Sequence, residues 1–269
     1  MTVRITRQGL TPLNAHYENR PPLEILSFAH ETFGDRVAIL CGMQRAGTVL
    51  CHMADRAGLG FDVLFIDTGV MHQQTLATRD ELAKTHPRLR VFTLSPARTF
   101  AEQTQQEGLL YLSRGGQERC CDMRKSDPLR GLRGRYDAFI TALRRGEGGA
   151  RAKIGVFELD QEMGALRVHP FVNIAPTDLD RYIAVHDDVV VNPLHAMGFL
   201  TIGCFPCTTP VRDDEPERAG RWRHLAGVDY CGINPTDRVR AEDAFVVLDD
   251  RYGPPFGLVS ARSYRPGPR

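Results

Sequence analysis

The feature that most constrains this chain is a regular alternation of short apolar segments with helical ones. Residues 36–40 (RVAIL) form a β-branched apolar run, a loop with Gly42 and Gly47 follows, and residues 48–58 have apolar side chains at helical spacing. The same order of strand, turn and helix repeats over residues 61–94. Alternation of this kind predicts an α/β fold, a parallel sheet with helices on both faces that binds ligands beyond the carboxyl ends of its strands.

Further segments extend this pattern in both directions. Residues 21–34 predict a helix that ends at a glycine just before the first strand. Residues 136–143 and 165–173 predict two more strands, and residues 176–187 (PTDLDRYIAVHD) predict a helix. We therefore expect a single sheet that draws on most of the chain.

The domain organisation is expected to consist of one domain over residues 1–234 and a C-terminal extension over residues 235–269. Residues 244–250 (AFVVLDD) are apolar enough to form a strand, which predicts that the extension is partly ordered. Residues 262–269 (RSYRPGPR) are expected to be a disordered tail.

The composition excludes several classes of protein. Lys and Arg (34) nearly balance Asp and Glu (33), which disfavours a nucleic-acid coat or an acidic disordered tail. The sequence has no apolar run long enough to cross a membrane, and its first residues lack the apolar core of a signal peptide. We expect a cytoplasmic protein with neither nucleic acid nor membrane as a partner.

Seven cysteines in a reducing compartment favour metal binding or thiol chemistry over disulfides. Cys120 and Cys121 are adjacent, and Cys204 and Cys207 form a CxxC pair much later in the chain. Four thiolates could hold a tetrahedral zinc ion or a [4Fe–4S] cluster. The adjacent pair is awkward for a zinc ribbon but could bind two irons of one cubane. Alternatively, the adjacent pair consists of unrelated buried thiols, and the CxxC pair functions alone.

Cys231 stands apart from these four, beside a glycine in the segment YCGIN. Its thiol is a candidate nucleophile if nearby cations stabilise the thiolate, and Arg218 and Arg221 lie just upstream. Alternatively, it is a surface cysteine without a role. Cys41 and Cys51 lie in apolar strand and helix contexts and are expected to be core residues.

Ordered blocks of the sequence resemble a known family, the assimilatory sulfonucleotide reductases, and specifically the iron–sulfur branch that reduces adenosine 5′-phosphosulfate. The blocks include LFIDTG, RCCDMRKSDPLR, VNPLHAMGFLTIGCFPCTTPV, ERAGRW and YCGIN, and the similarity runs from about residue 13 to residue 234. The resemblance implies an adenine nucleotide α-hydrolase-like parallel sheet. Because members of the family commonly self-associate, it also implies a homo-oligomer.

The resemblance assigns a role to each of five cysteines. It implies that Cys120, Cys121, Cys204 and Cys207 bind a [4Fe–4S] cluster. It implies that Cys231 attacks the sulfur of the bound phosphosulfate, leaving an S-sulfocysteine and releasing AMP. Thioredoxin or glutaredoxin then frees sulfite.

The resemblance also implies that basic residues surround the substrate, an adenine sulfonucleotide. It implies that Lys125 lies between cluster and substrate, and that Arg218 and Arg221 clamp the phosphosulfate. Without the resemblance, each of these residues could be a solvated surface charge. The other expected substrate contacts are Arg45, Gly47, Asp67, Thr68, Gly69, Arg144, Arg145 and Arg151.

Three blocks depart from the family pattern, all of them expected near the nucleotide. The nucleotide-binding loop has Ala46 and Gly47 where the family has an acidic pair. A later Arg-Arg-Asp-x-Ser pattern keeps Arg144 and Arg145 but loses its Asp and Ser, and Asn234 replaces a terminal histidine.

These departures leave three hypotheses for the function. The first is a divergent adenylylsulfate reductase that uses Arg45 and backbone contacts to hold the same nucleotide. The second is a family member repurposed for sulfur or sulfonate transfer in a specialised biosynthetic pathway, with the cluster and Cys231 retained. The third is a cluster-bearing sensor that no longer turns over substrate.

Overall fold

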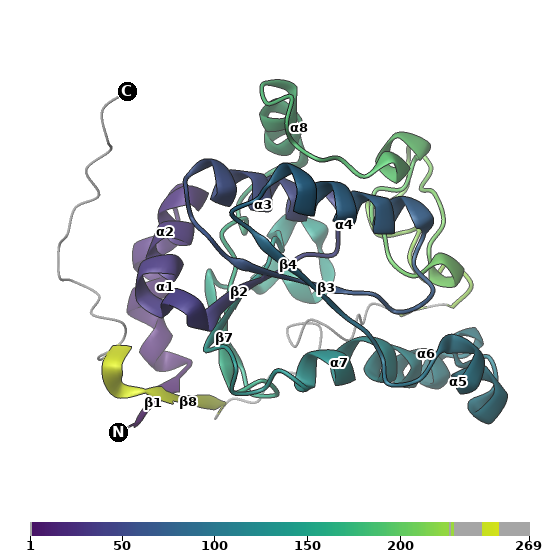
Figure 1. The fold of residues 1–269 in the computed structure, drawn as a ribbon, viewed down its shortest axis with the longest axis horizontal. Helices are drawn as coiled ribbons and strands as arrows, with labels where there is room; N and C mark the ends of the chain where they lie inside the picture. The colour runs from purple at the N-terminus through teal and green to yellow at the C-terminus, as the bar shows by residue number, and fades with distance from the viewer. Residues whose placement is uncertain (1, 226, 229–243, 253–269) are drawn as a thin grey trace.

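The central layer of the protein is a six-stranded sheet with the strand order β4-β3-β2-β5-β7-β6 (Figure 1). The structure is a computed structural model that describes residues 2–225, 227–228 and 244–252. All neighbouring strands are parallel except β6, which runs antiparallel to β7. In chain order the strands are β2 (Val37–Leu40), β3 (Asp62–Ile66), β4 (Arg90–Leu94), β5 (Ala138–Ile140), β6 (Phe157–Asp160) and β7 (Ala165–Val168).

Helices cover both faces of this sheet. They are α1 (Thr11–Tyr17), α2 (Pro22–Phe33), α3 (Arg45–Arg56), α4 (Gln73–Thr85), α5 (Phe100–Glu107), α6 (Arg114–Cys121), α7 (Asp127–Arg130) and α8 (Pro176–Ala184). The α/β fold predicted from the alternation is therefore confirmed. The predicted strands over residues 136–143 and 165–173 are present but shorter, and the edge strand β6 was not predicted.

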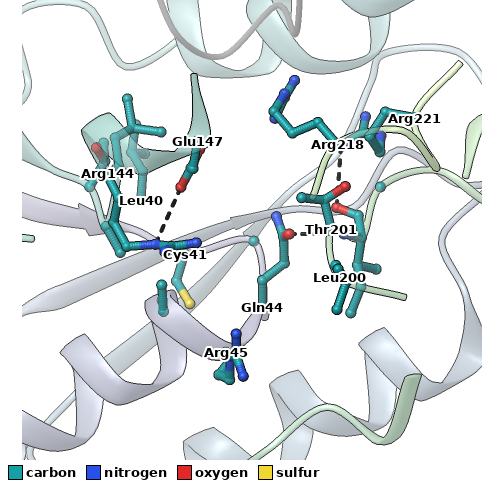
Figure 2. Close-up of a pocket in the computed structure, with 18 of the residues that line it drawn as sticks. Leu40, Cys41, Gln44, Arg45, Arg144, Glu147, Leu200, Thr201, Arg218 and Arg221 are labelled. Atoms are coloured by element: carbon teal, nitrogen blue, oxygen red, sulfur yellow. Dashed lines mark hydrogen bonds and ion pairs between the residues drawn. The ribbon is translucent and has the colours of Figure 1, made fainter. Parts of the chain in front are cut away.

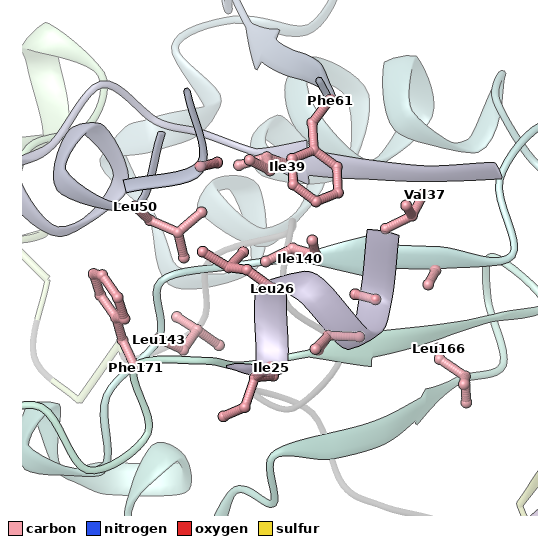
Figure 3. Close-up of a cluster of buried hydrophobic side chains, with 14 of the residues drawn as sticks. Ile25, Leu26, Val37, Ile39, Leu50, Phe61, Ile140, Leu143, Leu166 and Phe171 are labelled. Atoms are coloured by element: carbon pink, nitrogen blue, oxygen red, sulfur yellow. The ribbon is translucent and has the colours of Figure 1, made fainter. Parts of the chain in front are cut away.

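The larger core lies between the sheet and helices α2 and α3. Ile25 and Leu26 of α2 and Leu50 of α3 point toward Ile39 and Ile140 of the sheet (Figure 3). The apolar residues of α2 recur at helical spacing, so that the helix buries one continuous side.

A smaller core lies on the opposite face of the sheet. It contains Ala38 and Leu64 from the strands and Leu129 from α7. Ala38 and Ile39 are neighbours in β2 but belong to different cores, as expected because successive side chains of a strand point to opposite faces.

A separate two-stranded sheet joins the N-terminal strand β1 (Thr2–Thr6) to β8 (Phe245–Asp249) in antiparallel pairing. The strand predicted over residues 244–250 is thus present. Val246 and Leu248 are buried in the larger core, whereas Phe245 and Val247 are exposed.

Several predictions fall on residues that the structure does not describe. Cys231 and Asn234 lie outside the described residues, and so does the tail over residues 262–269. The division into a domain over residues 1–234 and an extension stays a prediction. Among the helices that the structure describes, none is long and apolar enough to span a membrane.

Candidate functional site

A pocket lies at the carboxyl ends of β2, β3 and β5, where the strand order reverses. The chain runs from β2 to β3 and β4 in one direction, while β5 lies on the other side of β2. Open α/β sheets bind ligands at such a switch point. Figure 2 shows this strand-end pocket; its lining includes Cys41, Gly47, Thr68, Lys125, Arg144, Glu147, Arg151, His195, Gly203, Cys204, Glu217, Arg218 and Arg221.

The turn between β2 and α3 brings the start of that helix to the pocket. Met43 has a left-handed backbone (φ 55°), and its carbonyl accepts a hydrogen bond from Asn192 Nδ2 at 3.0 Å. The side-chain oxygen of Gln44 accepts a hydrogen bond from the Ile202 amide at 2.8 Å. Gly47 lies in the first turn of α3, whose N–H groups have no partner within the helix. Such a helix start can receive an anion.

Arg45 begins α3 and lines the pocket as predicted. Its backbone N–H donates to His195 Nε2 at 2.9 Å. Its guanidinium, however, forms an ion pair with the carboxylate of Asp180 in α8. The charged group of Arg45 is therefore already engaged at one side of the pocket.

Two buried arginines in the pocket have donors without hydrogen-bond partners among the described residues. Arg144 is 2% exposed, and its Nε and Nη1 atoms are in this state. Arg221 is 8% exposed, and the same holds for its Nε and Nη2 atoms. Buried polar groups are normally satisfied. Unmet donors of this kind, facing a pocket, favour a ligand with hydrogen-bond acceptors.

The guanidinium of Arg221 is held in place by its two neighbours in space. It lies over the ring of Trp222, with Cζ at 4.4 Å from the ring centroid. Gly203 also lies close to it, and an added Cβ there would come within 2.5 Å of Cζ. The sequence signalled Arg221 but not Gly203, since this close approach exists only in three dimensions.

Two carboxylates also line the pocket, and the sequence did not single them out. Glu217 accepts a hydrogen bond from Arg144 Nη2 at 2.5 Å. Glu147 lies 3.7 Å from Arg144 Nε and forms a second ion pair with Arg151. The two acids and two arginines form one connected group.

The four predicted cluster ligands line a single second pocket, called the thiol pocket below. Cys120 and Cys121 end helix α6, and Cys204 and Cys207 border a short 3₁₀ turn. A π-helical turn (Asp122–Ser126) directly follows the adjacent cysteines, while Cys121 itself keeps ordinary helical angles.

Side-chain donors point at three of the four sulfurs. Gln117 Nε2 lies 3.1 Å from Cys121 Sγ, and Gln103 Nε2 lies 3.5 Å from Cys120 Sγ. The hydroxyl of Thr68 lies 3.2 Å from the sulfur of Cys204, and it can donate once Cys204 is a thiolate. Hydrogen bonds of this kind surround thiolates that hold an iron–sulfur cluster and tune it.

Burial affects the protonation of these thiols. Together with the sulfur of Cys204, it raises the pKa of Cys207 to about 12. Burial likewise raises the pKa of Cys120. Four thiols in one pocket are a donor set that fits an iron–sulfur cluster, and binding it would require the loss of their protons. Within the described residues, no three or more His, Cys, Asp or Glu side chains converge on a site for a single metal ion.

Lys125 and Cys204 connect the two pockets, because both residues line each of them. Lys125 lies in the π-helical turn and is 5% exposed, with Nζ at 3.8 Å from Cys121 Sγ. A bound anion in the strand-end pocket would therefore meet a lysine that also contacts a thiol.

Not every predicted substrate contact lines the strand-end pocket. Arg145 points away from it and binds Glu18, Asn173 and the carbonyl of Ile154. Next to β3, Thr68 lines the pocket, whereas its neighbours Asp67 and Gly69 are absent from the lining and bond to each other at 2.8 Å. The other predicted contacts, Arg45, Gly47, Arg144, Arg151, Arg218 and Arg221, all line it.

Comparison with known proteins identifies the family. Residues 36–210, which contain the sheet and all four clustered cysteines, match the model of the phosphoadenosine phosphosulfate reductase domain. The chain belongs to this family. Membership places it among oxidoreductases that act on sulfur groups.

Relatives with established names agree with this membership. An adenosine 5′-phosphosulfate reductase of Streptomyces coelicolor is 38% identical over 81% of this chain and 89% of its own length. One of Mycolicibacterium smegmatis is 35% identical over 78% of this chain and 87% of its own length. The predicted resemblance to sulfonucleotide reductases is confirmed.

A solved structure in this family has the same fold. It is the phosphoadenylyl-sulfate reductase of Candida auris in complex with phosphate, with a TM-score of 0.64 and 20% identity. The match covers 76% of this chain and 98% of that protein.

Proposed function

We propose that this enzyme reduces adenosine 5′-phosphosulfate to sulfite and AMP. The observation that carries the proposal is a strand-end pocket in which Arg221 has guanidinium donors unmet by the described residues, and which shares Lys125 and Cys204 with the thiol pocket. A phosphosulfate is strongly anionic, and a thiolate can approach it only where cations neutralise both. The names of the curated relatives support the same substrate.

The proposed nucleophile is Cys231, which lies outside the described residues. Its thiolate attacks the sulfur of the sulfonate, so that a sulfur–sulfur bond forms and the bond from sulfur to the AMP phosphate oxygen breaks. AMP leaves with that electron pair. A dithiol reductant, thioredoxin or glutaredoxin, then attacks the Cys231 sulfur, releases sulfite and ends as its own disulfide, which returns Cys231 to the thiol.

Different described residues bind different parts of the substrate. Lys125 and Arg221 neutralise the sulfonate end of the substrate, next to the thiol pocket. The first-turn amides of α3 receive the phosphate, as helix starts commonly do. Donors of Arg144 remain for uncharged oxygen or nitrogen atoms of the nucleoside. A cytoplasmic location and self-association remain part of the proposal.

We also infer that Cys120, Cys121, Cys204 and Cys207 hold a [4Fe–4S] cluster. All four line one pocket, and the donors of Gln103, Gln117 and Thr68 are directed at their sulfurs. When bound, the cluster would offset part of the charge of the four thiolates and would join the segments that carry Lys125 and Cys204.

The cluster assignment is tested by metal analysis of protein purified without oxygen. We expect iron and acid-labile sulfide in the wild-type protein and a loss of both in Cys204→Ser. The control is Cys51→Ala, which removes a buried thiol of α3 outside both pockets and should retain the iron. Zinc in place of iron would overturn the assignment.

The reaction is tested by intact mass measurement after incubation with adenosine 5′-phosphosulfate in the absence of a reductant. We expect the wild-type mass to rise by one SO₃ group and the mass of Cys231→Ser to stay unchanged, because only the former has the proposed nucleophile. Adding thioredoxin should reverse the gain and release sulfite. A cluster-loaded wild-type protein that gains no mass would contradict the proposal.

A further inference from the structure

The strand-end pocket contains two carboxylates although it is built for an anion. Its described lining includes six basic side chains, those of Arg45, Lys125, Arg144, Arg151, Arg218 and Arg221. The acids Glu147 and Glu217 lie among them. A carboxylate next to a bound phosphate repels it, so these two residues oppose the binding of negative charge near them.

The two acids engage one subset of the basic residues. Glu217 binds Arg144, and Glu147 contacts both Arg144 and Arg151. The Arg144 side chain is 3% exposed, and those of Arg151, Glu147 and Glu217 are 8%, 10% and 22% exposed. Because the group is largely shielded from water, its two positive and two negative charges cancel at short range.

The other basic residues of the lining lie outside this group. Figure 2 shows Arg144 and Glu147 together on one side and Arg218 and Arg221 on the other, with Gln44 between them. Lys125 lies at the boundary with the thiol pocket. Both acids of the described lining therefore engage Arg144, which keeps the Arg144 side of the pocket neutral.

We propose that Glu147 and Glu217 set the charge selectivity of the strand-end pocket by keeping its Arg144 side neutral. The inference rests on the proposed function, since it assumes that the pocket binds a nucleotide. The site accepts a nucleotide whose anionic groups form a single chain directed at Lys125. It rejects a nucleotide that carries a further phosphate elsewhere, as on the ribose 3′ oxygen.

The unmet donors of Arg144 are compatible with this neutrality. Among the described residues, its Nε and Nη1 atoms lack hydrogen-bond partners although its charge is compensated by two carboxylates. A guanidinium in this state can still donate to a hydroxyl or a ring nitrogen. A second phosphate would instead be placed near Glu147 and Glu217 and would lose part of its attraction to the arginine.

The test compares the dissociation constants of AMP and adenosine 3′,5′-bisphosphate by calorimetry on cluster-loaded protein. The wild-type protein should bind AMP more tightly. In Glu217→Gln we expect the ratio of the two constants to shift toward the bisphosphate by about tenfold, because one unit of negative charge is lost at a few ångströms. Glu147→Gln should shift the ratio in the same direction and provides a second variant.

The matched control is Glu215→Gln, which removes the same charge from the same segment. Glu215 pairs with Arg223 and is absent from the described lining of the pocket. It should leave the ratio unchanged. The inference is overturned if the control shifts the ratio as much as Glu217→Gln, or if both pocket variants bind AMP but keep the wild-type ratio. A wild-type protein that binds neither nucleotide would contradict the proposed function itself. This result is distinguishable from an unchanged ratio, which contradicts only the inference about the two glutamates.

Discussion

Arg221 reaches the strand-end pocket through a space that exists because residue 203 is a glycine. The guanidinium lies over the Trp222 ring and close to Gly203, and a Cβ at position 203 would lie 2.5 Å from its Cζ atom. Contacts that short do not occur, so any larger residue must displace the arginine. The absence of a side chain at Gly203 thus decides where the guanidinium of Arg221, a proposed substrate contact, lies.

The variant Gly203→Ala tests this packing. We expect KM for the sulfonucleotide to rise about tenfold, which corresponds to the loss of one charge-assisted contact. Steady-state kinetics, with iron content measured in parallel, checks the result. Gly115→Ala is the control, since an added Cβ there meets nothing within 4 Å. An unchanged KM in Gly203→Ala would show that Arg221 does not depend on this glycine.

At the scale of single residues the sequence signalled charges and thiols but not their partners. The arginines and cysteines were recognisable by type and order along the chain. Gln103, Gln117 and Glu217 became visible only when the fold placed them beside Cys120, Cys121 and Arg144. Glutamines and glutamates are common on surfaces, so their type alone carries no signal.

At the scale of elements, the start of α3 depends on a histidine far away in the sequence. His195 Nε2 accepts the N–H of Arg45 at 2.9 Å, and its Nδ1 atom lies 2.7 Å from the Phe199 carbonyl. Both contacts require a neutral imidazole with its proton on Nδ1. Burial lowers the pKa of His195, and the nearby Arg45 charge lowers it further, while the Phe199 carbonyl acts in the opposite direction.

This arrangement predicts an acid-sensitive contribution to stability. Because the folded protein holds the pKa of His195 below its ordinary value of about 6.5, the unfolded chain takes up the proton first as the pH falls. The stabilisation is complete above about pH 6.5 and is lost as the pH falls toward the lowered value.

The variant His195→Gln checks this through urea unfolding at about pH 7.5 and about pH 5.5, on either side of the ordinary histidine pKa. We expect a loss of about 1 kcal/mol at the higher pH and a smaller difference between the two pH values than in the wild-type protein. Burial also lowers the pKa values of His52 and His72, but both residues are present in the wild type and in the variant. The difference in pH dependence between the two proteins therefore reports on His195 alone. An identical pH dependence would contradict the assignment.

At the scale of the whole molecule, the described segment after Cys231, the proposed nucleophile, is part of the main core. Val246, Leu248 and Tyr252 belong to the same buried cluster as the sheet and α2. The hydroxyl of Tyr252 also donates to Asp137, which binds Arg36. Through β8 and β1, the described end of the chain is therefore attached to its beginning.

Two substitutions on β8 test whether this attachment stabilises the fold. Val246→Ala should lower the free energy of unfolding by about 2 kcal/mol, since it removes two buried methyl groups and leaves a cavity. Val247→Ala changes the same side chain on the exposed face and should alter it by less than about 0.5 kcal/mol. Denaturant unfolding measures both, and equal losses would mean that β8 does not pack on the core.

The sequence by itself determined the α/β architecture, since hydrophobic periodicity and glycine-rich turns are local properties that appear directly in the order of residues. It also determined the family, which the ordered motifs around the cysteines indicated. Cys120 and Cys121, like Cys204 and Cys207, could be paired because close spacing along the chain already limits their separation.

Only the tertiary structure decided which charges face the ligand pocket. Arg144 and Arg145 are neighbours of equal charge, yet Arg144 lines the strand-end pocket while Arg145 binds Glu18 on another side. The extended backbone at Arg144 directs consecutive side chains to opposite sides. Glu217 meets Arg144 across 73 positions of sequence, a contact that depends on how the sheet and its loops pack. The charge pattern of the pocket is therefore a property of long-range packing, which no local pattern encodes.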